Sequence, residues 1–314
     1  MKEWLSKLAP FLEGFIQLKH SLGYSYCSRI QELHAFDKFV LKNFPNEIVL
    51  TKAMVDAWTK PHSAKERHST TNHRISILRE LARFIQMDGT SCYCPGKEYF
   101  LRTQQVSCHI LNDEEVKKFW RGLAQLKDSE GRQFRKITMT TFFTLLYCTG
   151  IRANEAMCLD CSNLDLENGL IKITESKGHN NRIIALTEEL VKLLKIYNEQ
   201  LPTNRIPFFS LDGSCRLNAR VVSYTLHYVW NKSDITTPCI KLYDFRHTFI
   251  TKRLLEWNKQ DKDLSTKIQY LMSFVGHKNI EDTLYYFSLS PELSETYELL
   301  LNDSIIPSLE RDEL

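Results

Sequence analysis

Apolar residues recur at the spacing of an α-helix through the first 85 residues of this 314-residue chain. Side chains three and four positions apart lie on one face of a helix, so each segment can bury an apolar stripe against its neighbours. Thr51 can cap the third helix and Pro61 ends it, and Ser69 or Thr70 can cap the fourth. The predicted helices cover residues 4–20, 28–41, 51–60 and 69–85. We therefore predict a helical domain over residues 1–90.

A break in this pattern separates two domains. Residues 88–107 contain two glycines and a proline, have mixed polarity and lack a helical period, which is typical of a connecting segment. Helical periodicity returns after Asn112, which can form a capping box with Glu115. We place the linker at residues 91–107 and the second domain, with a C-terminal tail, at residues 108–314.

The second domain contains both helical and strand-like patterns. Two short β-prone runs, residues 170–173 and 182–186, flank a polar tip at residues 176–181, which predicts a β-hairpin with Lys177 at its tip. Helical patterns cover residues 137–148, 152–157, 188–199, 220–230, 243–257, 265–274, 280–289 and 293–301. The predicted fold class is mainly α, with a small β-sheet or hairpin in the C-terminal domain.

Composition excludes several classes of protein. An apolar content of 43% and a charged content of 25% are ordinary for a globular protein. No apolar run approaches the roughly 18 residues that span a membrane, and the N-terminus does not resemble a signal peptide. Nine irregularly spaced cysteines favour reduced thiols over disulfides or a zinc site. We expect a cytoplasmic protein that has no membrane contact and needs no metal or other cofactor.

Positive charge is concentrated in the first domain. The whole chain carries a net charge of +3, but residues 60–83 hold six basic and only two acidic side chains. Such a patch is typical of proteins that bind a phosphate backbone, although a solvated charged face would give the same count. The candidate DNA-binding residues are Lys60, Lys65, Arg67, Arg74, Arg79 and Arg83.

Short stretches far apart in the second domain supply the groups that phosphate chemistry needs. Arg152 follows Gly150 at a predicted helix start, where free backbone N–H groups favour anions. Arg246 lies among aromatic and apolar residues, and a half-buried arginine needs an anionic partner. Two guanidinium forks can clamp one phosphate. Lys177 can protonate a leaving oxygen, and Tyr286 can act as a nucleophile. Each residue alone has an ordinary structural explanation, and their joint occurrence favours the phosphate site.

The order of these stretches resembles the active site of the tyrosine recombinases, the phage-integrase family. The family pattern is T-G-x-R-x-x-E, a hairpin lysine, H-x-x-R-H, and G-H with a tyrosine nine residues later. This chain matches it over residues 108–295. The resemblance implies strand cleavage through a 3′-phosphotyrosine, with the first domain as the core-binding domain. The implied catalytic residues are Arg152, Lys177, Tyr243, Arg246, His277 and Tyr286, supported by Glu155 and His247.

One position departs from the family pattern. Tyr243 stands where the family has a histidine that helps to take the proton of the nucleophile. A phenol can donate a hydrogen bond to phosphate but is a poor base near neutral pH. Removal of the Tyr286 proton would then depend on His277, on water or on the cationic field. We interpret His247 as a buried structural residue and Tyr285 as a core aromatic.

The sequence therefore predicts a site-specific recombinase or integrase of a mobile element that acts on double-stranded DNA. The resemblance implies a homotetramer on two duplexes, in which residues 293–306 dock onto a neighbouring protomer. Two alternatives stay open: a type IB topoisomerase, and a DNA-binding relative that has lost catalysis. The sequence does not reveal the target site, the biological setting or any requirement for accessory proteins.

Overall fold

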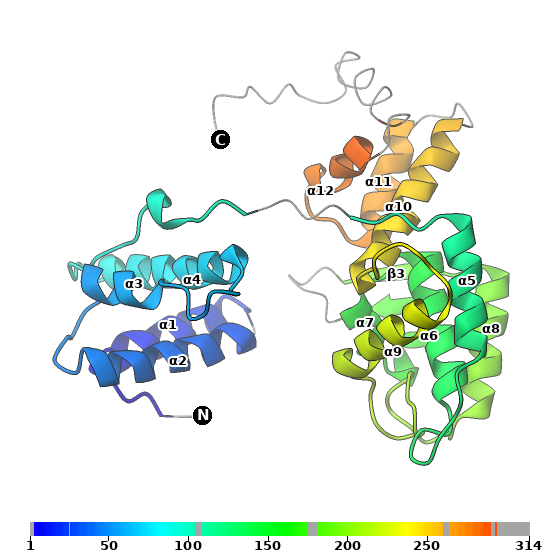
Figure 1. Ribbon diagram of the computed structural model, residues 1–314, viewed down its shortest axis with the longest axis horizontal. Coiled ribbons are helices and arrows are strands. Elements are labelled where there is room, and N and C mark those ends of the chain that lie inside the picture. The colour runs from blue at the N-terminus through cyan, green and yellow to red at the C-terminus, as the bar shows by residue number, and fades with distance from the viewer. Residues whose placement is uncertain are drawn as a thin grey trace. The chain divides into compact units, whose positions relative to one another are not determined.

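The computed structural model describes residues 3–24, 26–103, 108–174, 181–259, 264–289 and 293. The chain divides into two compact units, Met1–Val106 and Ser107–Leu314 (Figure 1). Unit 1 is helical, whereas unit 2 combines helices with a small sheet.

Unit 1 contains the four helices that the apolar pattern predicts, with small shifts at their starts. Thr51 caps the third helix by accepting a hydrogen bond from the Met54 backbone N–H. The first helix begins later than predicted, with Pro10 in its first turn, where the missing N–H costs nothing. The fourth begins after Arg67 without a side-chain cap, so neither Ser69 nor Thr70 caps it. The elements are α1 (Ala9–Ser21), α2 (Cys27–Asn43), α3 (Lys52–Trp58), α4 (His68–Met87) and the 3-10 helix η1 (Lys97–Tyr99).

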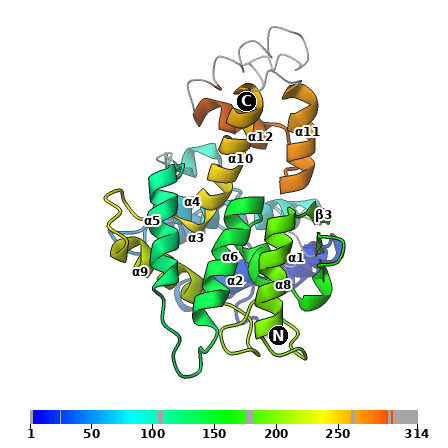
Figure 2. The ribbon, with the colours of Figure 1, turned by 90° about the vertical axis from the view of Figure 1, so that its right-hand side faces the viewer.

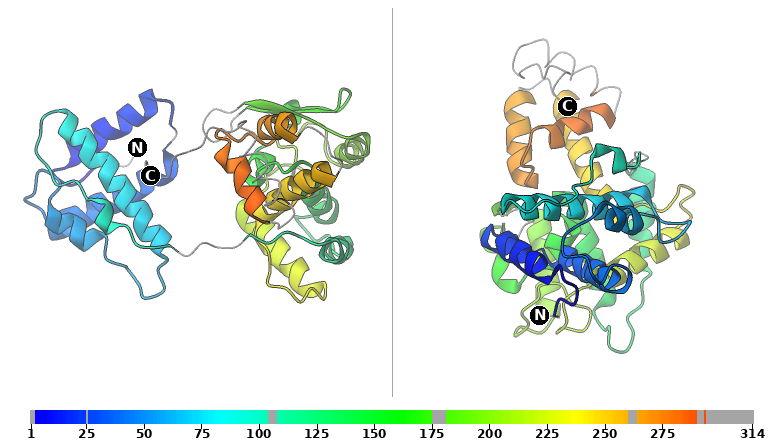
Figure 3. Two further views of the ribbon diagram at one scale, coloured as in Figure 1. Left: turned by 90° about the horizontal axis from the view of Figure 1, so that it is seen from above. Right: turned by 90° about the vertical axis from the view of Figure 1, so that its left-hand side faces the viewer.

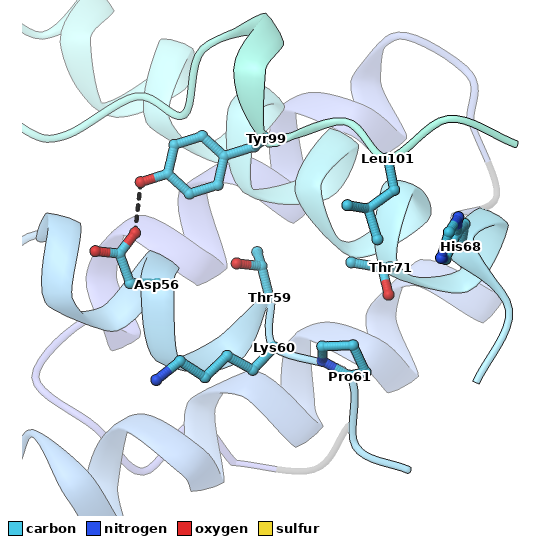
Figure 4. A pocket seen from close by; sticks show the side chains of 8 residues that line it. All are labelled: Asp56, Thr59, Lys60, Pro61, His68, Thr71, Tyr99 and Leu101. Carbon is cyan, nitrogen blue, oxygen red and sulfur yellow. Dashed lines mark hydrogen bonds between the residues drawn. The ribbon is translucent and has the colours of Figure 1, made fainter. Parts of the chain in front are cut away.

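Most of the segment that we predicted as a linker packs against unit 1. The Tyr93 N–H donates to the Leu50 carbonyl at 2.8 Å, and the Asn72 side chain bonds both the N–H and the carbonyl of Leu101 at 2.8 Å. Figure 4 shows the Tyr99 hydroxyl donating to Asp56 across a hollow of this unit. Paired backbone groups and the half-buried rings of Tyr93 and Tyr99 make this segment part of the unit.

Unit 2 is mainly helical, as predicted (Figures 2 and 3). Its helices are α5 (Asp113–Ala124), α6 (Arg135–Thr149), α7 (Ala153–Met157), α8 (Glu188–Gln200), α9 (Ala219–Lys232), α10 (Leu242–Lys259), α11 (Leu264–Val275) and α12 (Glu281–Leu284), with the 3-10 helices η2 (Cys161–Asn163) and η3 (Tyr285–Leu289). The helix predicted over residues 280–289 is thus divided between α12 and η3. Asn112 and Glu115 form the predicted capping box at α5.

The sheet of unit 2 has three antiparallel strands in the order β1 (Leu164–Asp165), β2 (Leu170–Ile173) and β3 (Arg182–Ala185). The register of β2 and β3 pairs Ile173 with Arg182. This pairing confirms the expected fold class of a mainly α protein with a small sheet. It also places Arg182 at the first position of β3, opposite the last residue of β2.

Two clusters of buried side chains hold unit 2 together. The larger is centred on α6 and includes Phe142, Phe143 and Phe245. The smaller joins α10, α11 and η3 and includes Ile250, Leu271 and Tyr286. Burying each such side chain contributes roughly 1.5–3 kcal/mol. The smaller cluster therefore fixes where the predicted nucleophile lies.

Two glycines end the helices that frame the site. Gly150 ends α6 with φ +61°, and Gly276 follows α11 with φ +70°. Glycine adopts this left-handed conformation without a steric penalty. A Cβ atom at Gly150 would lie 2.6 Å from the Phe249 ring, and one at Gly276 would lie 3.0 Å from the Arg182 guanidinium. The conformation and the close packing both require glycine at these positions.

None of the helices within the described residues is long and apolar enough to cross a membrane.

Candidate active site

The buried guanidinium of Arg246 joins the ends of two helices. Arg246 lies on α10 and is 1% exposed. Its Nη1 donates to the Gly150 carbonyl at 2.9 Å and its Nη2 donates to the Val275 carbonyl at 2.8 Å. These carbonyls lie at the C-terminal ends of α6 and α11, where helix dipoles concentrate negative charge. The Nε atom has no hydrogen-bond partner among the described residues, so a buried donor is left for a further acceptor.

Glu155 orients two more guanidinium groups. Its Oε1 accepts from Arg152 Nη1 at 2.9 Å and from Arg182 Nη1 at 3.1 Å, while its Oε2 accepts from Arg182 Nη2 at 2.7 Å. Burial raises the pKa of the Glu155 carboxyl, but the bonds from Arg182 and Arg152 outweigh burial and hold that pKa below its ordinary value. The carboxylate therefore stays ionised and fixes both arginines. Arg152 Nη2 also donates to the Gly276 carbonyl at 3.0 Å.

Arg182 is the site residue that sequence reasoning did not single out. It begins β3, its side chain is 7% exposed, and its Nε donates to the Phe274 carbonyl at 2.9 Å. The feature of the sequence that could have identified Arg182 is a basic residue at the first position of an apolar strand. That signal is weak, because only the docking of β3 against α11 places the side chain beside Glu155.

His277 lies beside these arginines at the end of α11. Its Nδ1 is 2.7 Å from the Thr283 hydroxyl. Burial, together with the nearby charges of Arg246 and Arg152, lowers the pKa of His277 to about 3. The ring is therefore neutral near pH 7. When the Thr283 hydroxyl donates to Nδ1, the ring proton is on Nε2 and can be donated to an anion.

Tyr286 meets the same group of residues from η3. The side chain is 2% exposed, and its hydroxyl lies 3.1 Å from His247 Nδ1. Its ring stacks on His277, with centroids 6.1 Å apart and an interplanar angle of 16°. Burial and then Tyr243 raise the pKa of the Tyr286 phenol, whereas Arg246 lowers it less. The phenol is protonated near neutral pH, so attack by its oxygen needs a proton acceptor.

Two tyrosines lie at the exposed side of this cluster. Tyr243 is 45% exposed, and its ring meets the His247 ring edge-on at a centroid distance of 4.8 Å. Tyr285 is 43% exposed, so our prediction of a core aromatic was wrong at this position. Its hydroxyl lies 3.7 Å from Cys108 Sγ. Consecutive residues of a 3-10 helix point in different directions, so Tyr286 is buried while Tyr285 remains accessible.

Positive charge dominates the centre of the site. The guanidinium groups of Arg152 and Arg182 bond the Glu155 carboxylate, and Arg246 lies close enough to interact with the charges of Glu155 and Arg152. Burial and then repulsion from Arg152 lower the pKa of Arg246. A bound anion would relieve this repulsion. The arrangement is therefore suited to a phosphate and to the negative charge that develops on it during substitution.

Three predictions from the sequence concern Lys177, the C-terminal tail and a metal site. Lys177 lies outside the described residues, and so does the tail predicted to dock onto a neighbour, except for Leu293. Among the described residues, no three or more His, Cys, Asp or Glu side chains are arranged to hold a metal ion.

The predicted DNA-binding residues of unit 1 fall into two groups. Lys60, Lys65, Arg67 and Arg83 are exposed, and Arg79 is half-buried beside the Pro95 carbonyl. Arg74 is different. It is only 4% exposed and donates to the Glu66 carboxylate and to the Trp58 carbonyl. The α4 stripe that packs the core carries Arg74 inward, so we remove this residue from the candidate DNA-binding surface.

Comparison with known proteins agrees with this geometry. Residues 110–292 match the model of the phage integrase family, which is more than half of the chain, so the chain belongs to that family. It resembles y4rE of Sinorhizobium fredii (strain NBRC 101917 / NGR234), named as an integrase/recombinase, with 24% identity over 91% of this chain and 93% of the relative. It also resembles the tyrosine recombinase XerD of Rhizobium meliloti (strain 1021), with 24% identity over 69% of each chain. The protein is a DNA-breaking and -rejoining enzyme of the tyrosine recombinase class.

Solved structures share the fold. A lambda integrase dimer bound to a COC′ core site superposes with a TM-score of 0.64 at 14% identity, over 88% of this chain and 94% of that chain. The Tn1549 transposon integrase in complex with transposon right end DNA superposes with a TM-score of 0.64 at 14% identity, over 93% and 99%. The family and the fold class expected from the sequence are thereby confirmed.

Proposed function

We propose that this recombinase cleaves DNA by attack of the Tyr286 hydroxyl on a backbone phosphorus, forming a covalent 3′-phosphotyrosine. The observation that carries the proposal is the meeting of three elements around one point. The end of α11 contributes His277, α10 contributes Arg246 with an unpartnered buried Nε, and η3 contributes Tyr286. A buried cationic donor beside a tyrosine hydroxyl is the arrangement that an in-line attack on a phosphodiester needs.

Each residue of the site has its own role in binding the phosphate. Arg246 and Arg152 donate to the non-bridging oxygens, and Arg182 supports Arg152 through their shared partner Glu155. His277 donates from Nε2 while its Nδ1 is held by Thr283. The exposed hydroxyl of Tyr243 adds a hydrogen bond to the same phosphate. Each donor aimed at the developing charge can lower the barrier by roughly 2.7–4 kcal/mol.

The chemical step exchanges one phosphate ester for another. The Tyr286 oxygen bonds to phosphorus, the bond to the 5′-oxygen breaks, and that oxygen takes a proton from Lys177 on the predicted hairpin tip. A 5′-hydroxyl of another strand then attacks the phosphotyrosine, gives its proton to the Lys177 amine and releases Tyr286. The linkage conserves the free energy of the original bond, so rejoining consumes no nucleotide.

The DNA partner is double-stranded, and unit 1 binds its backbone through Lys60, Lys65, Arg67, Arg79 and Arg83. Several solved structures that share the fold are DNA complexes by title. We further propose a role in the integration of a mobile element. The similarity to an integrase/recombinase over nearly the whole chain supports that role. Exchange between two duplexes breaks four strands, and each protomer supplies one Tyr286, so we propose a homotetramer.

A nicked suicide duplex that traps cleaved strands tests the nucleophile. Wild-type protein is expected to form a protein–DNA adduct that survives denaturing electrophoresis. The Tyr286→Phe variant is expected to form none, because it lacks the attacking oxygen. The Tyr285→Phe variant provides a matched control at the adjacent exposed position and is expected to retain the adduct.

Each contrary result identifies a different error. An adduct in Tyr286→Phe would overturn the assignment of the nucleophile. Wild-type protein that binds the duplex without linking to it would favour a DNA-binding relative without catalysis. Relaxation of supercoiled DNA without any preferred sequence would favour a topoisomerase.

A further inference from the structure

The Tyr286 hydroxyl already has a basic partner. His247 Nδ1 lies 3.1 Å from it, and the two rings have centroids 5.5 Å apart at 49°. His247 follows Arg246 on α10, so the helix that places the buried guanidinium also places this imidazole. We interpreted His247 from the sequence as a structural residue, and the structure places its Nδ1 in contact with the Tyr286 hydroxyl.

The other groups near Tyr286 are less suited to accept its proton. Tyr243 occupies the position where the family pattern has a histidine, and a phenol is a poor base near neutral pH. His277 has its Nδ1 engaged by Thr283, and the pKa of its ring is lowered to about 3. Among the described residues, the nitrogen that contacts the Tyr286 hydroxyl belongs to His247.

We propose that His247 is the proton acceptor for Tyr286, in place of the histidine that this chain lacks at position 243. The inference rests on the proposed function of Tyr286. In the tautomer protonated at Nε2, Nδ1 takes the proton of the hydroxyl as its oxygen bonds to phosphorus and the 5′-oxygen departs. The imidazolium returns that proton to Tyr286 when the phosphotyrosine is attacked by a 5′-hydroxyl.

The surroundings of His247 favour the neutral imidazole that this step requires. Burial lowers the pKa of His247 below its ordinary value of 6.5, Asp244 opposes the shift, and Arg246 and Lys241 add to it. These charged groups lie on or beside α10. From η3 the ring faces Tyr286 and Tyr285, and from its own helix it faces Tyr243. The base is therefore unprotonated at pH 7.

Substitution by asparagine separates proton transfer from positioning. The side-chain oxygen of Asn can accept the hydrogen bond in the place of Nδ1, but it cannot take up a proton. In single-turnover cleavage of the suicide duplex, His247→Asn is expected to lower the rate of adduct formation by about 10²–10⁴-fold. His20→Asn, at an exposed position of unit 1, is the matched control and is expected to cleave at the wild-type rate. Melting curves and DNA affinity verify that both variants are folded.

The dependence of the cleavage rate on pH distinguishes a proton acceptor from a residue that is only structural. Wild-type cleavage is expected to slow as the pH falls through the pKa of His247, because the protonated ring cannot accept. His247→Asn is expected to lose this fall in rate at low pH, the acid limb of the profile. A folded His247→Asn that cleaves within about tenfold of wild type, less than general-base catalysis contributes, would overturn the inference. An unchanged acid limb would do the same.

A substrate with sulfur in place of the bridging 5′-oxygen shows at which end of the reaction His247 acts. A thiolate leaves without needing a proton, so this substrate is expected to rescue Lys177→Ala. It is expected to leave His247→Asn slow, because the proton of the nucleophile must still be removed. Rescue of His247→Asn would assign the residue to the leaving group and overturn the inference. Failure of the proposed function is distinguishable, because wild-type protein would then form no Tyr286 adduct with either substrate.

Discussion

Arg74 in unit 1 and Arg246 in unit 2 are both buried, but they have different partners. Arg74 in unit 1 is 4% exposed and donates to the Glu66 carboxylate. Arg246 in unit 2 is 1% exposed, and its terminal nitrogens donate to the carbonyls of Gly150 and Val275. No carboxylate forms an ion pair with Arg246 among the described residues.

The difference explains why burial alone does not identify a ligand site. A buried arginine whose charge is compensated by a carboxylate stabilises its own domain. Arg246 is held by neutral carbonyls and has a buried Nε without a partner among the described residues, so a phosphate can compensate its charge. From the sequence we assigned both residues to phosphate binding, and only Arg246 has surroundings that suit it.

The strongest way to test this comparison is the same conservative substitution at both positions. Arg246→Lys is expected to slow cleavage of the suicide duplex by about 10²–10³-fold, or roughly 2.7–4 kcal/mol, because one ammonium cannot bond both helix ends and a phosphate. Arg74→Lys is expected to cleave at the wild-type rate. Equal losses in the two folded variants would mean that the two arginines do not differ in function.

The second test removes the structural arginine. Arg74→Ala is expected to lower the free energy of unfolding of unit 1 by roughly 1–3 kcal/mol, because Glu66 loses its partner. Chemical denaturation measures this change. Under conditions in which Arg74→Ala is folded, the affinity of this variant for DNA is expected to match that of wild type.

Arg83→Ala is the matched control for Arg74→Ala at an exposed position of the same helix. It is expected to leave stability within about 0.5 kcal/mol. If Arg83 contacts one phosphate, the slope of log affinity against log salt falls by about 0.9. Weaker salt dependence in Arg74→Ala instead would restore Arg74 to the DNA-binding surface.

A further test concerns pH and stability. The pKa of His277 is about 3 in the folded protein, below the ordinary 6.5. The unfolded chain therefore binds a proton between these values that the folded protein does not, so stability falls as pH is lowered from 6.5 towards 3. His277→Asn is expected to show a shallower loss in denaturant titrations at pH 7, 5.5 and 4. An unchanged dependence would contradict this account of the ring's surroundings.

Local signals predicted much of the fold correctly. Thr51 and Asn112 cap helices where the pattern places them, because a cap depends on side chains within one turn. The apolar stripe of α4 is buried as its period predicts. The split of residues 280–289 into α12 and η3 was missed, because helical periodicity does not distinguish α from 3-10 geometry over so few residues.

The sequence by itself determined which residue types are present and in what order, and that was enough to suggest Arg152, Arg246, His277 and Tyr286 as partners. Only the tertiary structure decided that Arg182 joins them, that Arg74 is buried against Glu66 in unit 1, and that His247 contacts the Tyr286 hydroxyl. The physical reason is that charge compensation and proton transfer depend on distances of about 3 Å between atoms. Residues far apart in the chain reach such distances only through the packing of helices and strands.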